Sequence, residues 1–264
     1  MYFGARAHSL DDIEFLAQAG FKFAEIDWKD PRLLSTQLAE LEALQDKYSI
    51  AYLAHGPNER NPFDVDEIIE VMGPTVCQLL NLAPELGITL HTQHLWLDPR
   101  FMSAEAIARK LDLLETWMEH AARASVTLCI ENLSEHADHF APAFQRLPGL
   151  CMTLDLGHGE ILSQPNASFG FIACFPDRIR HVHLHDNHGG SEVKDDLHLP
   201  IGEGHIDFTA ILRELRAAGY DSGLSFEIGL DYVEQSRDAI REMWNAVVKP
   251  ECAGMTEIEK RGVL

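Results

Sequence analysis

The stretch Val126–Leu133, V-T-L-C-I-E-N-L, is an apolar run of strand length that carries the carboxylate of Glu131 near its end. Five other short apolar stretches of the chain have the same design. Each presents an imidazole or a carboxylate near its C-terminal end, at His55, His91, Asp155, His183 and Glu227. Because side chains alternate along a strand, we expect these groups to share the inward face with the residue two positions earlier.

Segments with helical periodicity separate these stretches, so that strands and helices alternate along the chain. The expected strands are residues 1–6, 21–28, 50–54, 88–91, 126–133, 150–155, 179–185 and 224–228. The expected helices are residues 9–19, 34–48, 66–86 with a break at Gly73-Pro74, 103–125, 140–147, 169–175, 206–218 and 233–248.

Eight such units in 264 residues predict one α/β domain over residues 1–264, a (β/α)8 TIM barrel. Residues 249–264 are expected to form a C-terminal tail or a packing extension. A doubly wound sheet is the alternative, but no G-x-G-x-x-G follows the first strand, and such a sheet rarely carries functional residues on nearly every strand. In a barrel, the C-terminal ends of the strands form one rim, and we expect a metal site there.

Carboxylates and imidazoles crowded at one rim repel one another or are costly to bury unless a cation binds them. His, Asp and Glu without thiolates suit Zn²⁺, Mn²⁺, Co²⁺ or Fe²⁺. Two local patterns add candidate ligands. His158 follows Asp155 by three residues, and Asp196 and His198 project to one side of the polar loop 186–204. The following P-I-G-E-G is expected to fix the path of that loop.

The segment H-L-H-D-N-H-G (183–189), followed by D-L-H-L-P-I-G-E-G-H-I-D-F (196–208), resembles the xylose isomerase-like barrel superfamily. This superfamily contains sugar isomerases and epimerases and also the endonuclease IV apurinic nucleases. The resemblance spans about residues 55–228. In the isomerase branch it implies one metal ion, held by Glu131, Asp155, His183 and Glu227, with the two glutamates as the acid–base pair.

In endonuclease IV nine ligands hold three zinc ions. Carried over to this chain they are His55, His91, Glu131, Asp155, His158, His183, Asp196, His198 and Glu227. The DNA-contact pattern differs, because Asn58 stands where those nucleases have an aromatic residue, and Thr92-Gln93 replaces the Pro-Gly that follows their fourth-strand histidine. Epimerases of free ketoses often have an arginine near Gly189 and Gly190, so the substrate specificity also stays open.

The charge balance bears on possible partners. With 21 Lys and Arg against 42 Asp and Glu, the net charge is −21, which disfavours nucleic acid as a partner without excluding it. No apolar run approaches a membrane span, no signal peptide is visible, and the five cysteines form no C-x-x-C pair. We therefore expect a cytoplasmic protein, with a homo-oligomer left open.

These observations favour a metal-dependent isomerase or epimerase that moves a proton next to a carbonyl of a small carbohydrate-like substrate. Glu131 and Glu227 are expected to be base and acid, with one to three Zn²⁺ or Mn²⁺ ions bound per chain. The expected substrate contacts are His158, His185 and Lys194. The alternatives are a zinc-dependent phosphodiesterase or apurinic endonuclease of the endonuclease IV type with a di- or trinuclear site, and a non-catalytic barrel.

Some polar residues are expected to have lesser roles. Glu25 and Asp27 of the second strand could reach the substrate, but a salt bridge is the expected role. His94 is assigned to a loop or to a place behind the ligands.

Overall fold

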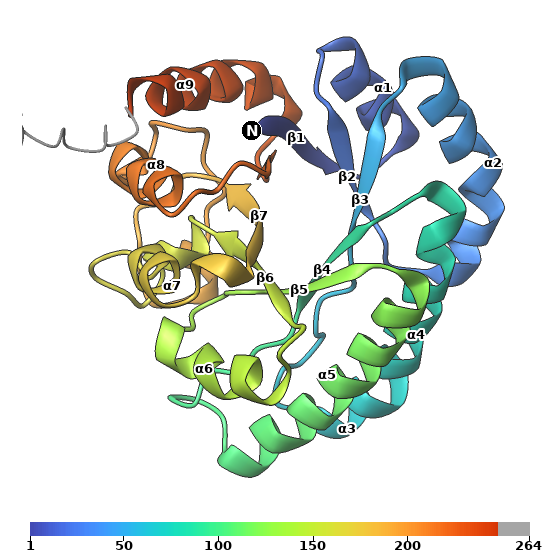
Figure 1. The fold of residues 1–264 in the computed structure, drawn as a ribbon, viewed down its shortest axis with the longest axis vertical. Coiled ribbons are helices and arrows are strands. Elements are labelled where there is room, and N and C mark those ends of the chain that lie inside the picture. The colour runs from blue at the N-terminus through green and yellow to red at the C-terminus, as the bar shows by residue number, and fades with distance from the viewer. Residues whose placement is uncertain (248–264) are drawn as a thin grey trace, which may run out of the picture.

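Eight short strands pair in parallel in chain order and close into a barrel where β8 pairs with β1 (Figure 1). The strands are β1 (Tyr2–Ala7), β2 (Phe23–Asp27), β3 (Ala51–His55), β4 (Leu90–His94), β5 (Thr127–Glu131), β6 (Cys151–Asp155), β7 (Ile179–Leu184) and β8 (Gly223–Phe226). The computed structural model describes residues 1–247, and the expected tail at 249–264 lies outside the described residues. The predicted parallel barrel is confirmed.

Helices follow the strands and surround the barrel (Figure 1). They are α1 (Leu10–Gln18), α2 (Pro31–Tyr48), α3 (Val65–Glu67), α4 (Gly73–Leu82), α5 (Ala104–Ala124), α6 (Ala137–Arg146), α7 (Ser168–Cys174), α8 (Phe208–Ala217) and α9 (Val233–Ala246). Short helical turns are η1 (Ile68–Met72), η2 (Ala83–Leu86), η3 (His158–Glu160), η4 (Pro176–Arg178), η5 (Val193–Asp195) and η6 (Leu230–Tyr232).

The helix boundaries follow local signals in the sequence. Ser9 and Asp12 form a capping box at the start of α1, where each side chain accepts a hydrogen bond from the backbone N–H of the other. Ser103 caps α5 in a similar way. The expected break at Gly73-Pro74 is a change from the π-helical turn η1 to α4, whose first turn accepts a proline.

The fourth strand lies further along the chain than predicted, because β4 ends at His94 and not at His91. In the register with β5, His94 is opposite Glu131. Thr92 also faces the interior, where its Oγ1 lies 2.7 Å from Oγ1 of Thr153 on β6. Since neighbouring residues of a strand alternate, His91 points to the opposite face of the strand from Thr92 and His94.

The barrel separates an apolar outer layer from a polar interior. Phe226 of β8 and Ile130 of β5 are fully buried in the core between strands and helices, as the predicted alternation requires. At the bottom of the interior, Phe23 contacts His181 edge-on, with ring centroids 5.7 Å apart. Gly4 leaves room for Phe23, since a Cβ at this position would lie 2.3 Å from its ring.

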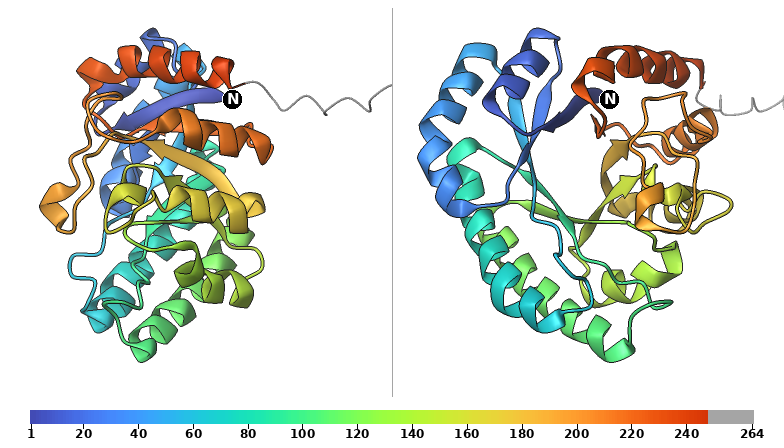
Figure 2. Two further views of the ribbon diagram at one scale, coloured as in Figure 1. Left: turned by 90° about the vertical axis from the view of Figure 1, so that its left-hand side faces the viewer. Right: turned by 180° about the vertical axis from the view of Figure 1, so that it is seen from behind.

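The long loop between β7 and α8 carries η5 and is fixed by Asp186. One carboxylate oxygen of Asp186 accepts from the N–H of Asn187 and Ile206, and the other accepts from Gly202. Gly202 has φ +94°, a left-handed conformation that favours glycine. The hydrogen bond and the backbone conformation of Gly202 explain how the P-I-G-E-G segment fixes the path of the loop, as predicted. Figure 2 (left) shows the loop projecting at the end of the barrel opposite the N-terminus.

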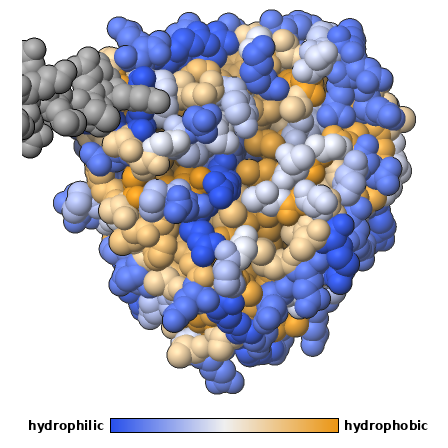
Figure 3. Space-filling model, in the orientation of Figure 1, coloured by the Kyte–Doolittle hydropathy of each residue, from blue (hydrophilic) through white to orange (hydrophobic). Residues whose placement is uncertain are grey.

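Hydrophilic side chains cover most of the periphery of the face drawn in Figure 3, and hydrophobic residues are visible between them toward the middle. Such a surface agrees with the excess of acidic residues in the chain. None of the helices within residues 1–247 combines the length and the hydropathy that a membrane crossing requires.

Candidate metal centre

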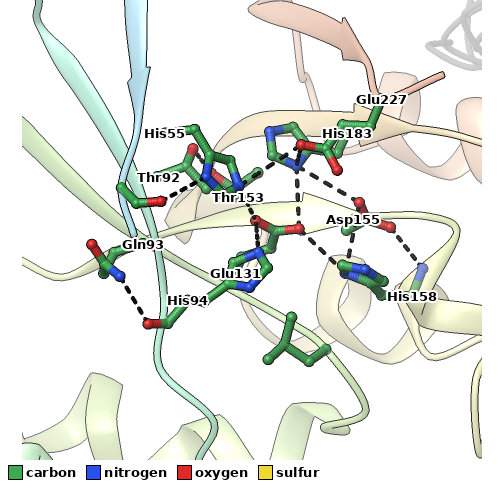
Figure 4. Close-up of polar contacts among 12 residues, drawn as sticks. His55, Thr92, Gln93, His94, Glu131, Thr153, Asp155, His158, His183 and Glu227 are labelled. Atoms are coloured by element: carbon green, nitrogen blue, oxygen red, sulfur yellow. Dashed lines mark hydrogen bonds and ion pairs between the residues drawn. The ribbon is translucent and has the colours of Figure 1, made fainter. Parts of the chain in front are cut away.

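Three carboxylates from different strand ends converge around the Nδ1 atom of His183 (Figure 4). Glu131 Oε1 lies 3.2 Å from this atom, Glu227 Oε1 3.4 Å and Asp155 Oδ2 3.7 Å. Glu131, Asp155 and His183 are fully buried, and the Glu227 side chain is 9% exposed. The structure therefore brings together the four residues that the family resemblance assigns to one metal ion.

The donor atoms of this cluster fit a divalent cation. Glu131 Oε1, Asp155 Oδ2 and His183 Nδ1 are buried, and none of them has a hydrogen-bond partner among residues 1–247. Buried polar atoms without partners are rare in proteins and call for an explanation. Ligands that share an ion at about 2.0–2.2 Å lie about 3–3.6 Å apart. The observed separations are close to this range, so the cluster is a candidate metal site.

Glu25 of β2, expected from the sequence to form a salt bridge, lies behind His183 and orients its imidazole. Its Oε1 and Oε2 lie 2.9 and 3.0 Å from Nε2 of His183, and Oε2 lies 3.0 Å from Nε2 of His181. A carboxylate beside Nε2 fixes the imidazole proton on that atom, so the lone pair of Nδ1 points toward the cluster. In the sequence, the only sign that Glu25 could orient a histidine is the presence of an acidic residue on the second strand.

The charges of the cluster depend on one another. Burial raises the pKa of Glu131, but the neighbouring charges of His183 and His94 outweigh burial and hold this pKa well below its ordinary value. Burial lowers the pKa of His183, while the charges of Glu227, Glu25 and Glu131 raise it well above its usual range. Without a cation the carboxylates thus retain a proton on His183, and a metal ion would take the place of that proton.

A second group lies beside the first and shares Glu131. His94 Nε2 is 3.0 Å from Glu131 Oε2, and His55 Nε2 is 3.4 Å from the same oxygen. The three side chains can offer their donor atoms to one ion. The place expected for His91 is therefore taken by His94, while His91 Nε2 lies 3.1 Å from Gln93 Oε1 on the outer face of β4.

A third group is formed by the loop after β7 and the turn after β6. Asp196 Oδ2 lies 3.3 Å from His158 Nε2 and 3.2 Å from His198 Nε2. His185 stacks on His198, with ring centroids 3.9 Å apart, and its Nε2 lies 3.1 Å from Asp155 Oδ1. The group can likewise offer four donor atoms to one ion.

The three groups open into a cavity of about 420 Å³, a volume that suits a small-molecule ligand. Its lining includes His55, His94, His158 and Asp196 from the groups above. Lys194 is not among the residues that line this cavity. Its side chain is 73% exposed, and its Nζ pairs with Glu192 at 2.8 Å. The structure thus places His158 at the cavity, His185 behind it and Lys194 on the surface.

Comparison with known proteins agrees with this geometry. The family model described as Xylose isomerase-like TIM barrel matches residues 13–244, most of the chain. The chain belongs to this family. The resemblance stated from the seventh strand and its loop is therefore confirmed. Another similar sequence, the uncharacterized protein MJ1311 of Methanocaldococcus jannaschii, is 26% identical over 230 residues, which cover 81% of this chain and 77% of that protein.

Several solved structures share the xylose isomerase-like barrel with this chain. A D-tagatose 3-epimerase-like protein has 24% identity and a TM-score of 0.79, over 94% of this chain and 98% of that one. The D-allulose 3-epimerase from Methylomonas sp., in complex with D-allulose, has 18% identity and a TM-score of 0.72, over 92% and 90%. The IOLI protein, solved with a zinc atom, has 16% identity and a TM-score of 0.74, over 94% and 98%. At these identities the likeness shows a fold shared with sugar 3-epimerases.

Proposed function

We propose that this protein is a metal-dependent isomerase or epimerase that transfers a proton next to the carbonyl of a small sugar or hydroxy-carbonyl compound. The observation that carries the proposal is the pair of glutamates at one ion position. Glu131 and Glu227 approach the same His183 nitrogen, at 3.2 and 3.4 Å, from β5 and from the end of β8.

Glu131, Asp155, His183 and Glu227 would hold a Zn²⁺ or Mn²⁺ ion. When bound, such an ion polarises the substrate carbonyl and makes the proton on the adjacent carbon more acidic. In this proposal Glu131 and Glu227 remove that proton and return one, as base and acid. The carboxylate that removes the proton must be ionised, and the carboxylate that returns one must carry it at that moment. Burial raises the pKa of Glu227, but the charge of His183 outweighs it and keeps the pKa below its ordinary value.

The remaining polar residues of the cavity would bind and orient the substrate. His158 faces the cavity from the turn after β6, His198 from the β7–α8 loop, and His55 and His94 from β3 and β4. Imidazoles can donate to or accept from sugar hydroxyl groups, depending on their protonation. Holding the reacting carbon against a fixed carboxylate is a large part of the rate acceleration in such a reaction.

Solvent deuterium exchange tests the proposal. Metal-loaded protein in D₂O is expected to incorporate deuterium at the carbon next to the carbonyl of at least one member of a panel of ketoses, as measured by NMR. Chelation should stop the exchange. Glu227→Gln should slow it by about 10²–10⁴-fold, the usual contribution of a general acid or base. Failure of exchange across neutral, acidic and phosphorylated sugars with fully loaded protein would contradict the proposal.

Hydrolysis of a phosphoester is the second candidate, favoured by the two further groups beside the first ion position. His94 and His55 with Glu131, and His158 and His198 with Asp196, would allow two or three ions per chain. Multinuclear sites of this kind assist phosphoester cleavage. Three ions per chain with cleavage of abasic DNA would favour this candidate. One ion per chain without cleavage would remove it.

A further inference from the structure

We infer that Arg6 is a specificity-determining residue and that the substrate carries an oxyanion, a carboxylate or a phosphate, which Arg6 binds. The inference extends the proposed function, because it concerns the class of compound that enters the same cavity. The first observation is the position of a positively charged side chain. Arg6 lies near the end of β1, its side chain is only 7% exposed, and it lines the cavity above the metal centre.

The guanidinium of Arg6 has hydrogen-bonding capacity that the protein leaves unused. Its Nη2 donates to Asp27 Oδ1 at 2.5 Å. Its Nη1 is buried and donates to no acceptor within the part of the chain that the structure describes. The nearest carboxylate oxygen recorded for Nη1 is Glu227 Oε1, at 3.5 Å. Buried arginine nitrogens are normally paired, because a desolvated donor without an acceptor is unfavourable.

Asp27 holds two further nitrogen donors beside Arg6. Lys29 Nζ lies 3.0 Å from Asp27 Oδ1, and His8 Nδ1 lies 3.0 Å from Oδ2. Burial raises the pKa of Asp27, but the hydrogen bond from His8 and the charges of Arg6 and Lys29 outweigh it and lower the pKa. One ionised carboxylate thus faces two permanent cations. The two cations on this wall offset Asp27 and the nearby Glu227, whereas the whole chain has a net charge of −21.

Lys29 also lines a neighbouring hollow of about 870 Å³. The charged residues of this hollow are Lys29, Arg32 and Arg60 and the acidic Asp30 and Glu67, so basic side chains outnumber acidic ones by one. A ligand that enters from this side passes basic side chains before it reaches the metal ligands. An oxyanion is the complementary group, since the planar guanidinium binds carboxylate and phosphate oxygens through charge-assisted hydrogen bonds.

The geometry limits how far the oxyanion lies from the reacting carbon. Glu227 Oε1 is 3.5 Å from Arg6 Nη1 and 3.4 Å from His183 Nδ1, so a single carboxylate oxygen separates Arg6 from the metal centre. A compound that contacts both therefore has its charged group within a few bonds of its carbonyl. Sugar acids and short sugar phosphates have this arrangement, and neutral sugars lack the charged group.

A matched set of ligands tests the inference without requiring turnover. The affinities of metal-loaded protein for D-fructose, D-fructuronate and D-fructose 6-phosphate are compared by calorimetry. One or both anions should bind at least about tenfold more tightly than fructose, as a charge-assisted hydrogen bond predicts. The preferred anion distinguishes carboxylate from phosphate. Equal affinities, including no measurable binding of any of the three, would overturn the inference.

Variants then assign the preference to Arg6. Arg6→Gln should weaken the binding of the anions far more than that of fructose, and Arg6→Lys should restore part of the preference for anions. The exposed Arg213 of α8 provides the control, because Arg213→Gln removes the same charge far from the cavity and should preserve the preference. If Arg6→Gln weakens all three ligands equally, Arg6 only positions Glu227 and the inference is wrong.

The two proposals can fail separately. Arg6-dependent preference for anions without deuterium exchange would contradict the proposed reaction and leave the oxyanion site standing. Deuterium exchange with neutral sugars, without a preference for anions, would support the proposed reaction and contradict the oxyanion site.

Discussion

Glu25 is not among the residues that line the cavity, yet it faces the imidazole at the centre of the candidate metal ligands. Its carboxylate lies 2.9–3.0 Å from Nε2 of His183 and is fully buried. The charges of His183 and His181 outweigh burial and hold the pKa of Glu25 well below its ordinary value. Glu25 is therefore ionised and can fix the His183 proton on Nε2.

Glu25→Gln is expected to lower metal affinity by about 10–100-fold, the usual effect of losing a partner of a metal-binding histidine. Competition with a chelating dye measures the affinity, and ¹⁵N chemical shifts report the His183 tautomer. Glu40→Gln on the exposed side of α2 removes the same charge and should change neither quantity. An unchanged affinity in Glu25→Gln would show that Nδ1 of His183 needs no support from Glu25.

For single residues, the sequence predicts the inward position of a side chain well where that residue ends a clear apolar run. Glu131, Asp155, His183 and Glu227 all lie where alternation places them. Glu25 could not be assigned in the same way. Its partner His183 is 158 residues away, and only the closed barrel brings the two strands' inward faces together.

At the scale of elements, a buried ion pair joins α5 to the loop after β3. Lys110 Nζ lies 2.6 Å from Glu59 Oε1, with side chains 0% and 4% exposed, and it also donates to Trp96 O. Burial lowers the pKa of Lys110, although the charge of Glu59 opposes this. Glu59 in turn accepts from Trp96 N, so the pair also fixes the loop after β4 beside the cavity.

Lys110→Met should lower the free energy of unfolding by about 3–5 kcal/mol, because it leaves the Glu59 carboxylate buried without its partner. The double variant with Glu59→Gln should recover part of this loss. Arg109→Met is the matched control, since the neighbouring Arg109–Asp66 pair is exposed and should contribute less than about 1 kcal/mol. Denaturant titration measures all three. Equal losses for Lys110→Met and Arg109→Met would contradict the interpretation.

The fourth strand shows that local sequence alone cannot predict which face of a strand points inward. The segment I-T-L-H-T-Q-H offers two histidines of opposite parity, His91 and His94, and local pattern cannot decide which one faces inward. The decision comes from pairing with β5, which sets His94 opposite Glu131. Register between strands is a long-range property, and a shift by one residue exchanges the two faces.

At the scale of the whole molecule, the metal should stabilise the fold more strongly as the pH rises. His158 and His183 are buried, and burial lowers their pKa values, but the neighbouring carboxylates raise them well above the ordinary value. In metal-free protein these imidazoles contribute stability below about pH 6.5, which is lost as the pH rises through their raised pKa values. A metal ion needs both imidazoles neutral and must displace the protons.

The increase in the unfolding temperature on addition of Zn²⁺ or Mn²⁺ should therefore be larger near pH 8 than near pH 5. At a free metal concentration of about 100 Kd, the gain in free energy is about 2.7 kcal/mol, and chelation should reverse it. Scanning calorimetry at both pH values, with and without chelator, checks this. A larger gain at the lower pH would show that other groups hold the ion.

The seam where β8 meets β1 joins the first and the last strand of the barrel and closes the ring. Glu227 follows the other proposed ligands along the polypeptide, and Arg6 of β1 faces it across the seam. Because β8 follows the other seven strands along the chain, these two side chains can meet only after β8 has left the ribosome. We therefore expect the nascent chain to complete the proposed ion site only at that stage of translation.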